Sequence, residues 1–561
     1  MTPTKNSPPE ITLKVIILGI ILSCLLAGAN AYMGLFAGMT VSASIPAAVI
    51  SMGIFRFFKN HSILENNLVQ TAASAGESIA AGVIFTIPAL ILLNYWTTFN
   101  YWETTFIAAT GGIIGVLFSI PLRKALIVKT PLKFPEGVAT AEVLKSGATG
   151  SSAIKIILQA GIIGAAFKFI QSGLKLWNES IEGGGLFGNT IVYFGTNLSP
   201  ALLGVGYIVG LPIAVLVFAG GTFAWLIGIP LHSFFYGASS QNPVEAAWII
   251  WSRQIRFVGV GAMVIGGLWA IVNLWNPVIT GIKQNMTAFK GLNENNNILE
   301  ADTEKDTPFS IVVILLVLLI IPVFFFYQSI VGKIWISIPM TMVMIFAGFL
   351  FSAVAAYMAG LVGSSNNPIS GITIATILFS SLLIVMLMGK GSLVGPAAAI
   401  LIGAVVCCAA AIAGDNMQDL KAGYLLGATP WKQQLMQGVG TLSAAFVLAP
   451  VLMLLLQAYG IGGEPTELHP KPLKAPQATL MQNVAKGVFL GNLPLKMILT
   501  GVLAGILIIA FDKYQERKNS SFRTPVLAVA VGIYLPLELT VPIFLGGVIQ
   551  FFSSRIINRK D

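Results

Sequence analysis

Apolar runs long enough to cross a lipid bilayer recur along almost the whole chain of 561 residues, from Ile11 to Phe552. A helix needs about 20 consecutive apolar residues to span the hydrocarbon core, because each residue advances it by about 1.5 Å. Only 10% of the residues are charged, whereas soluble domains average about 25%. The sequence therefore predicts an all-α polytopic integral membrane protein, with no separate soluble domain.

The runs and their breaks predict about 14 to 16 transmembrane helices, some of them broken or re-entrant. The strongest candidate spans are residues 11–35, 37–56, 68–93, 104–121, 153–176, 201–227, 256–277, 309–329, 334–359, 370–389, 392–413, 434–458, 495–511 and 524–552. Shorter or more polar pieces at residues 135–148, 229–251, 415–430 and 479–493 are expected to form half-helices or re-entrant segments.

One long polar break, residues 281–308, divides the chain into an N-terminal half, residues 1–280, and a C-terminal half, residues 309–561. The two halves contain similar short segments. Ala31-Tyr32-Met33 recurs as Ala356-Tyr357-Met358, and Glu65-Asn66 resembles Asp415-Asn416. Two repeated halves joined by a polar loop are therefore predicted, an arrangement typical of secondary transporters with a binding site at the repeat interface.

The basic residues indicate topology rather than a nucleic-acid partner, because they lie in short loops and not in one stripe. By the positive-inside rule, the N-terminus and the loops at Arg56 and Arg123 face the cytoplasm. The loop Tyr95–Glu103 has aromatic residues but no Lys or Arg, so it is expected to face outward. Basic residues both precede and follow the last apolar run, so both of its ends are expected in the cytoplasm. Either a re-entrant break around Pro536 to Pro542 allows this, or one basic cluster breaks the rule. The C-terminus is expected in the cytoplasm, and the protein is assigned to the inner (cytoplasmic) membrane.

A polar face runs along the helix expected after Leu64. With side chains about 100° apart, seven polar residues fall within an arc of about 140°. They are Asn66, Asn67, Gln70, Thr71, Ser74, Glu77 and Ser78. Because such a face is too costly against lipid, we predict that Asn66, Asn67, Gln70 and Ser74 contact a substrate, and that Glu65 and Glu77 carry protons. The alternative is that the polar residues join helices and that Glu65 caps the helix start.

Two prolines predict breaks that expose backbone groups inside the membrane domain. Pro135 stands at an early position of a helix start, which predicts a half-helix; an ordinary loop helix explains the same residues. Pro368 interrupts the run 363–371, where small and polar residues predict a binding loop rather than a surface turn. The contact residues expected in that loop are Ser364, Ser365, Asn366 and Asn367.

Three more carboxylates stand in apolar surroundings. Asp415 and Asp419 share one helical face, where they would bind a cation, accept a proton or pair with Lys421; the alternative is a charged connector. Glu538 follows Pro536 in the last apolar run. Tyr534 is a predicted substrate contact and Glu538 a predicted proton carrier. Either a kinked helix turns both toward a cavity, or a re-entrant break places Glu538 near water.

An ordered set of motifs, spread from about residue 11 to 552, resembles the oligopeptide transporter family. The set is Asn30-Ala-Tyr-Met-Gly-Leu, Ser44-Ile-Pro-Ala-Ala-Val, Leu64-Glu-Asn-Asn, Phe134-Pro-Glu-Gly, Gly363-Ser-Ser-Asn-Asn-Pro, Gly414-Asp-Asn-Met-Gln-Asp-Leu-Lys and Tyr534-Leu-Pro-Leu-Glu. The family pattern tends toward Leu where Met417 stands, which is a conservative change. The compact loops are more similar to the prokaryotic and yellow stripe-like branch than to the long fungal members.

The resemblance implies a secondary active, proton-coupled symporter that imports small oligopeptides, or else metal chelates by the same mechanism. Sodium coupling stays open, because Asp and Asn oxygens also suit a hard cation. A membrane-embedded enzyme is a weaker alternative, since the three histidines are widely spaced and no nucleophile motif is present. A channel would need repeated filter loops, which are not seen. No cofactor, no protein-bound metal site and no phosphate-binding loop is indicated.

Overall fold

The computed structural model describes residues 10–557, with gaps. The gaps are residues 39, 59–60, 129–131, 148–158, 160–161, 165, 168, 175, 179, 238–241, 267, 270–271, 273–301, 365–366, 368, 393, 463–466, 468, 471, 492–493 and 521. The predicted Ser365, Asn366 and Pro368, most of the span 153–176 and most of the polar loop 281–308 lie outside the described residues. The described part is helical apart from one β-hairpin, which confirms the predicted fold class.

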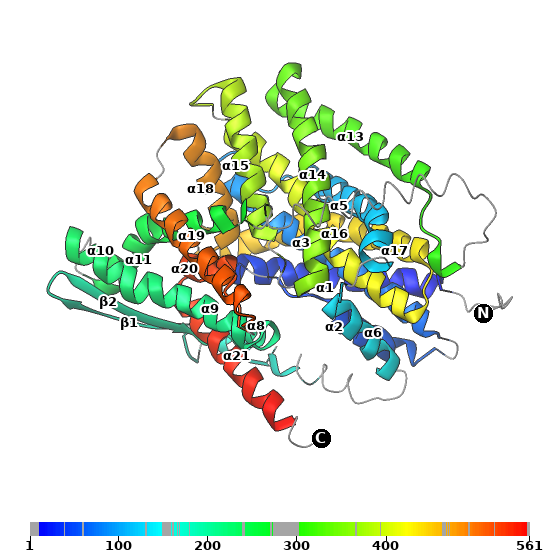
Figure 1. The fold of residues 1–561 in the computed structure, drawn as a ribbon, viewed down its shortest axis with the longest axis horizontal. Helices are drawn as coiled ribbons and strands as arrows, with labels where there is room; N and C mark the ends of the chain where they lie inside the picture. The colour runs from blue at the N-terminus through cyan, green and yellow to red at the C-terminus, as the bar shows by residue number, and fades with distance from the viewer. Residues whose placement is uncertain are drawn as a thin grey trace. The chain divides into compact units, whose positions relative to one another are not determined.

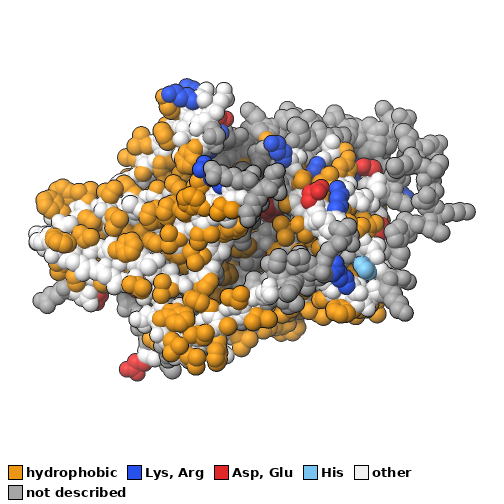
Figure 2. Space-filling model, turned by 90° about the horizontal axis from the view of Figure 1, so that it is seen from below, with side chains coloured by type: hydrophobic (Ala, Val, Ile, Leu, Met, Phe, Trp, Pro, Cys, Tyr) orange, Lys and Arg blue, Asp and Glu red, His pale blue; other side chains and the backbone are white. Residues whose placement is uncertain are grey.

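Within the described part, 12 helices are long and apolar enough to cross a membrane. Several segments predicted as full spans or pieces are shorter helices, namely α2 (Ser44–Phe55), α6 (Pro135–Gly147) and α18 (Pro476–Leu490). With 15 residues, α18 reaches only about 22 Å, less than the roughly 30 Å of a bilayer core. Figure 2 shows one face of the molecule on which hydrophobic side chains predominate, as expected for a surface that meets lipid.

The chain divides into two compact units, and the first comprises Met1–Ile157 and Ile271–Gly491. Besides α2, α6 and α18, it contains α1 (Leu13–Ala37), α3 (Ile63–Thr86), α4 (Pro88–Leu92), α5 (Tyr101–Arg123), the π-helical turn η1 (Lys124–Val128), the short η5 (Asp302–Glu304), α13 (Phe309–Val331), α14 (Ile334–Val362), α15 (Ile369–Met388), α16 (Gly395–Leu426) and α17 (Pro430–Tyr459). The predicted break after residue 363 separates α14 from α15.

Helix α16 forms the centre of the first unit and packs against α3, α5, α14 and α15 (Figure 1). Its sequence Gly395–Val406 consists of small and aliphatic residues, and nearly all of the 32-residue helix is buried. The helix continues without a break through Asp415 and Asp419 to Leu426. The prediction that residues 415–430 form a separate polar piece is therefore wrong; small neighbours let a continuous helix bury Asp419 fully and Asp415 in part.

The second unit comprises Leu158–Ala270 and Asn492–Asp561. Its elements are the π-helical turn η2 (Phe169–Gly173), strands β1 (Ser180–Phe187) and β2 (Thr190–Asn197), α8 (Pro200–Val209), α9 (Leu211–Thr222), η3 (Phe223–Gly228), α10 (Ile229–Tyr236), α11 (Pro243–Ile250), η4 (Trp251–Ile255), α19 (Leu495–Arg517), α20 (Val526–Tyr534) and α21 (Leu537–Ile557). The strands pair antiparallel, with Ser180 opposite Asn197 and Phe187 opposite Thr190.

Two predicted spans of the second unit are divided. Gly210, at φ +80°, separates α8 from α9, a conformation that favours glycine. Leu535 is extended before Pro536, so the last apolar run forms α20 and α21 rather than one helix. Each unit takes segments from both halves of the sequence, so the units do not follow chain order. The repeated halves remain a prediction, because this division does not test them.

Candidate functional site

Helix α3 begins with a capping box that uses Glu65. The backbone N–H of Glu65 donates to the Ser62 hydroxyl over 3.1 Å, and the Glu65 carboxylate accepts the Ser62 N–H over 3.0 Å. The same carboxylate accepts a hydrogen bond from the Thr12 hydroxyl and forms a 3.0 Å ion pair with Lys14. These contacts give Glu65 the capping role that the sequence left as an alternative to proton coupling.

The predicted polar face of α3 is buried inside the first unit rather than turned to lipid. Gln70 and Asn67 are fully buried, and Glu77 is 3% exposed. Asn67 donates to the Gln70 side chain over 3.1 Å and accepts from Gln433 of α17 over 3.2 Å. Asn66 lies one turn into the helix, where its amide donates to the Ser62 carbonyl. The face is therefore a protein-lined polar layer.

Asp419 joins α3 to α16 and to the start of α2. Its Oδ1 accepts hydrogen bonds from the Gln70 amide over 2.5 Å and from the Ser44 hydroxyl over 3.2 Å. Ser44 and Ser74 hydroxyls lie 3.0 Å apart. A hydrogen bond thus joins Gln70 and Asp419, two predicted site residues that lie 349 residues apart in the chain.

The Glu77 side chain binds both α1 and the linker that connects α1 to α2. Its carboxylate accepts a hydrogen bond from the Asn30 side chain, near the end of α1, and one from the Ala43 backbone N–H over 3.2 Å. The Asn30 side-chain nitrogen also donates to the Val41 carbonyl over 2.9 Å, and the side-chain oxygen accepts the Val41 N–H over 3.2 Å. The linker before α2 is therefore fastened to α3 through one titratable group.

Asp415 lies at the same polar layer, beside the α14–α15 break. The Ser78 and Ser364 hydroxyls are its neighbours, and its charge acts on Glu77. Ser364 also donates a hydrogen bond to the carboxylate of Glu136, at the start of α6. The start of α6 and the α14–α15 break are thus joined through Ser364 beside Asp415 of α16.

We call the set formed by Asn30, Ser44, Gln70, Ser74, Glu77, Asp415 and Asp419 the carboxylate cluster. Several fully buried polar atoms next to it have no protein partner among the described residues. They are Asp419 Oδ2, both amide atoms of Asn416, Gln437 Oε1, Thr441 Oγ1, Asn66 Oδ1 and Asn367 Oδ1. Because buried polar groups are almost always hydrogen-bonded, these atoms have capacity for water or a ligand. Among the described residues, no group of three His, Cys, Asp or Glu is arranged to hold a metal ion.

Tyr534 and Glu538 belong to the second unit, on either side of the α20–α21 break. Both side chains are buried, and the Arg256 guanidinium lies 5.0 Å from the centre of the Tyr534 ring. Burial and the charges of Glu538 and Glu182 raise the pKa of Tyr193, on β2, well above its ordinary value. The indole N–H of Trp225 donates to the Leu535 carbonyl at the break over 3.4 Å. These residues form a separate polar site of the second unit.

Comparison with known proteins identifies the family of the chain. A model of the family described as OPT oligopeptide transporter protein matches residues 10–561. The chain belongs to the OPT family. A Haemophilus influenzae protein named "Putative oligopeptide transporter" is 36% identical to this OPT chain over 546 residues, which cover 94% of the chain and 86% of the relative. A protein of Arabidopsis thaliana named "Metal-nicotianamine transporter YSL3" is 26% identical over 539 residues, which cover 86% of the chain and 77% of the relative.

Family membership confirms the predicted resemblance and makes the protein a multi-pass membrane transporter. The sequence prediction missed Gln433 and Gln437 of this OPT chain, which face the cluster from α17. Gln433 donates to the Asp419 carbonyl over 2.9 Å, and Gln437 donates to the Asn416 carbonyl over 3.3 Å. Together with Thr441 they repeat every four residues, a spacing that marks one face of a helix. This polar stripe in an otherwise apolar run is the sequence pattern from which both glutamines could have been predicted.

Proposed function

We propose that this protein is a proton-coupled symporter that imports small oligopeptides across the cytoplasmic membrane. The observation that carries the proposal is the carboxylate cluster, in which buried Glu77 and Asp419 and half-buried Asp415 share one layer with amide and hydroxyl side chains. Intramembrane carboxylates of this kind mark proton or ion pathways, because burying them without a function is costly. The positive-inside pattern supports cytoplasmic termini.

Glu77 is the best candidate for the coupling proton. As a carboxylate it offers acceptors to both the Asn30 amide and the Ala43 N–H. A proton on one oxygen makes that oxygen a donor and a poorer acceptor, so the hydrogen bond from one of the two N–H groups weakens. Protonation then weakens the attachment of the α1–α2 linker to α3 and removes a buried charge before the conformational step. Glu65, by contrast, is held by Lys14 and Ser62, and we assign it a structural role.

Peptide recognition is assigned to side chains that have hydrogen-bonding capacity left. Ser74, Ser364 and Asn367 line the layer from α3 and from the α14–α15 break. Peptide groups present donors and acceptors in alternation, which amide and hydroxyl side chains match. Asn67 and Gln70 contribute less, because both ends of each amide are already hydrogen-bonded within the protein.

Uptake of metal chelates is the second candidate function, with the metal as part of the cargo. The similarity to a protein named as a metal-nicotianamine transporter favours it. The amide and hydroxyl donors of the layer would equally receive the carboxylates of such a chelate. Both candidates use the same coupling mechanism, so they differ only in which cargo is carried.

Uptake into proteoliposomes tests both parts of the proposal. A labelled pool of di- to hexapeptides and a pool of iron chelates are offered with and without an inward proton gradient. We expect the gradient to accelerate uptake of one pool by the unaltered protein. Glu77→Gln should lose this acceleration but keep exchange of labelled for unlabelled substrate, because exchange needs no net proton movement.

The matched control is Glu142→Gln, an exposed carboxylate of α6 whose partner is Lys145. It should keep both gradient-driven uptake and exchange. Full gradient-driven uptake by Glu77→Gln would move the coupling role to Asp415 or Asp419. Absence of uptake of either pool under proton and sodium gradients would contradict the proposed function.

A further inference from the structure

A cavity of about 450 Å³ lies apart from the carboxylate cluster, between the segment that follows α4, the start of α5 and the last turns of α13. Its lining residues are Tyr95, Trp96, Glu103, Phe326, Ser329 and Ile330. All six belong to the first unit. The volume is within the usual range of small-molecule sites, roughly 300 to 1,000 Å³. Three aromatic rings and one carboxylate contribute to its wall.

The aromatic side chains are held by local structure. After α4 ends at Leu92, Asn94 adopts a left-handed conformation at φ +58°, and the N–H groups of Tyr95 and Trp96 both donate to the Leu90 carbonyl, at 3.0 and 3.2 Å. This tight turn fixes two neighbouring rings at the cavity. Phe326, on α13, packs against Phe106 of α5 with ring centres 5.2 Å apart. The cavity wall is therefore built before any ligand binds.

Glu103 gives the cavity a negative charge. Asn100, the N-cap of α5, accepts the Trp102 and Glu103 N–H groups through its side-chain oxygen and donates its amide to Glu103 Oε1 over 2.7 Å. No Lys, Arg or His among the described residues forms an ion pair with this carboxylate. Burial and the charge of Glu103 both raise the pKa of the Tyr95 phenol, so the tyrosine stays neutral beside it.

We propose that this cavity binds an organic ammonium group, held between the aromatic rings and the carboxylate of Glu103. The faces of Trp, Tyr and Phe rings attract cations, and a nearby carboxylate offsets the charge of the bound group. An ammonium nitrogen carries donors that match the free acceptor capacity of the carboxylate. Metal cations fit less well, because only one carboxylate is present and most of the wall is aromatic or aliphatic.

Two kinds of molecule carry such an ammonium group. The cavity lies where α5 begins and α13 ends, and helix ends of a membrane protein lie at the level of lipid headgroups. An ethanolamine lipid headgroup is one source, and the free amino group of a soluble molecule is the other. The inference does not depend on which cargo the transporter carries or on how transport is coupled.

The experiment uses the full-length protein, delipidated in detergent. Binding of phosphatidylethanolamine and of phosphatidylglycerol with matched acyl chains is measured by native mass spectrometry. Binding of a dipeptide amide and of its N-acetylated form is measured from the change in tryptophan fluorescence, with Trp96→Phe identifying the reporter. We expect the ligand with a free ammonium group to bind about tenfold more tightly than its matched partner in at least one of the two pairs.

Glu103→Gln keeps the shape of the site and should remove this preference, and Trp96→Ala should weaken binding of the preferred ligand. The control is Trp102→Ala, because Trp102 is 72% exposed in the same helical turn and does not line the cavity. It should bind as the unaltered protein does. A preference confined to the lipid pair identifies a headgroup site, and one confined to the dipeptide pair a soluble amine site. Equal binding within both pairs, or an unchanged preference in Glu103→Gln, would overturn the proposal.

Discussion

Buried polar residues of the first unit fall into two groups that their types alone do not distinguish. Gln418 uses both ends of its amide on backbone groups, since its oxygen accepts the Gly137 N–H over 2.8 Å and its nitrogen donates to the Ala359 carbonyl over 2.5 Å. It therefore fastens α6 and the end of α14 to α16. Asp419 and Asn416, its near neighbours, keep atoms without a protein partner and so have capacity for a ligand.

Replacing Gln418 should cost stability more than replacing Gln437. Gln418→Leu leaves the buried Gly137 N–H without its partner, at a cost of about 1 to 3 kcal/mol, and removes one of the two hydrogen bonds at the Ala359 carbonyl, which keeps the Gly363 N–H. Gln437→Leu removes a single 3.3 Å hydrogen bond. We expect a clearly lower denaturation midpoint for Gln418→Leu, measured by titrating purified protein in mixed micelles with SDS. Equal midpoints for the two variants would show that Gln418 does not hold these helices.

At the scale of elements, α3, α16 and α17 approach one another through small residues. A Cβ added at Gly440 of α17 would lie 1.9 Å from the Ala72 carbonyl oxygen of α3. A Cβ added at Gly82 of α3 would lie 2.5 Å from the Cys408 Cα of α16. Helix packing inside membranes relies on such small residues, because close backbone contact replaces the hydrophobic driving force. The crossings bring the polar faces of the three helices together.

Two glycines of α17 should therefore respond in opposite directions to the same substitution. Gly440→Ala should destabilise the protein by about 1 to 3 kcal/mol, because α3 must move away. At Gly438 the added Cβ would meet only Ile113, at 3.8 Å. Gly438→Ala should be neutral or should stabilise by up to about 1 kcal/mol through helix propensity. Thermal unfolding followed by size-exclusion chromatography measures both, and a harmless Gly440→Ala would contradict the close crossing.

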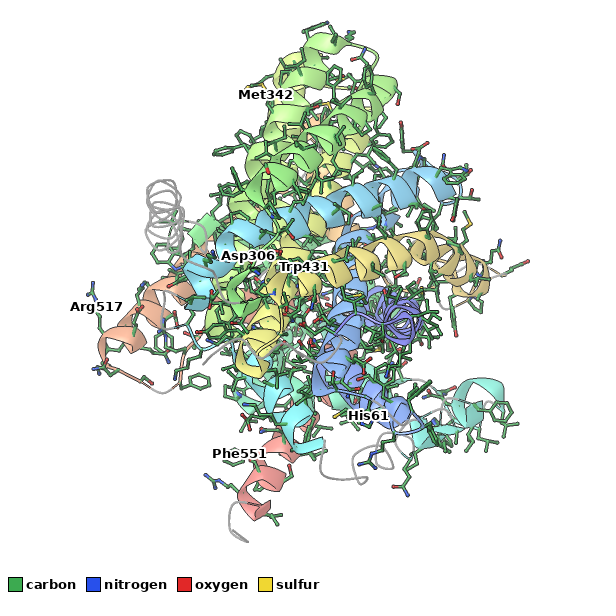
Figure 3. All side chains as sticks on the ribbon, turned by 90° about the vertical axis from the view of Figure 1, so that its right-hand side faces the viewer. His61, Asp306, Met342, Trp431, Arg517 and Phe551 are labelled. Atoms are coloured by element: carbon green, nitrogen blue, oxygen red, sulfur yellow. The ribbon has the colours of Figure 1, made fainter. Side chains whose placement is uncertain are left out.

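At the scale of the whole chain, segments far from α17 in sequence dock at its start. The Glu10 carboxylate accepts the Thr429 N–H over 3.0 Å and pairs with Lys432 over 2.9 Å. The end of the polar loop lies at the same place, where the backbone N–H of Trp431 donates to the Lys305 carbonyl over 3.1 Å. Asp306 and Trp431 mark this junction in Figure 3. Asp306 also binds the buried Arg123 guanidinium at 2.6 and 2.9 Å.

Breaking the Arg123–Asp306 pair should destabilise the first unit strongly. Arg123 has a side chain only 1% exposed, so Arg123→Ala leaves a poorly solvated Asp306 at a cost of about 3 to 5 kcal/mol. Lys145→Ala is the control, because the Lys145–Glu142 pair is exposed and contributes at most about 1 kcal/mol. Thermal unfolding should separate the two variants by several degrees. Similar melting temperatures would show that the loop end is not anchored here.

The sequence by itself determined the fold class, the polar face of α3 and the helix boundaries at Pro135 and Pro536, but not the break at Gly210 or the continuity of α16. Each of these depends on a local property. Apolar length decides which segments cross a bilayer, the helical repeat decides which side chains share a face, and proline decides where a helix ends or begins. The ordered motifs indicated the OPT family for the same reason, since each motif is a short local segment.

Only the tertiary structure decided which of the predicted polar residues meet. Glu65 pairs with Lys14 at a helix start, whereas Glu77 fastens the α1–α2 linker, although both are glutamates of α3. Asp419 meets Gln70, while Tyr534 and Glu538 lie in the other compact unit. The physical reason is that a buried polar atom is satisfied by partners on neighbouring helices, and the neighbours are chosen by close packing of small residues across the whole chain.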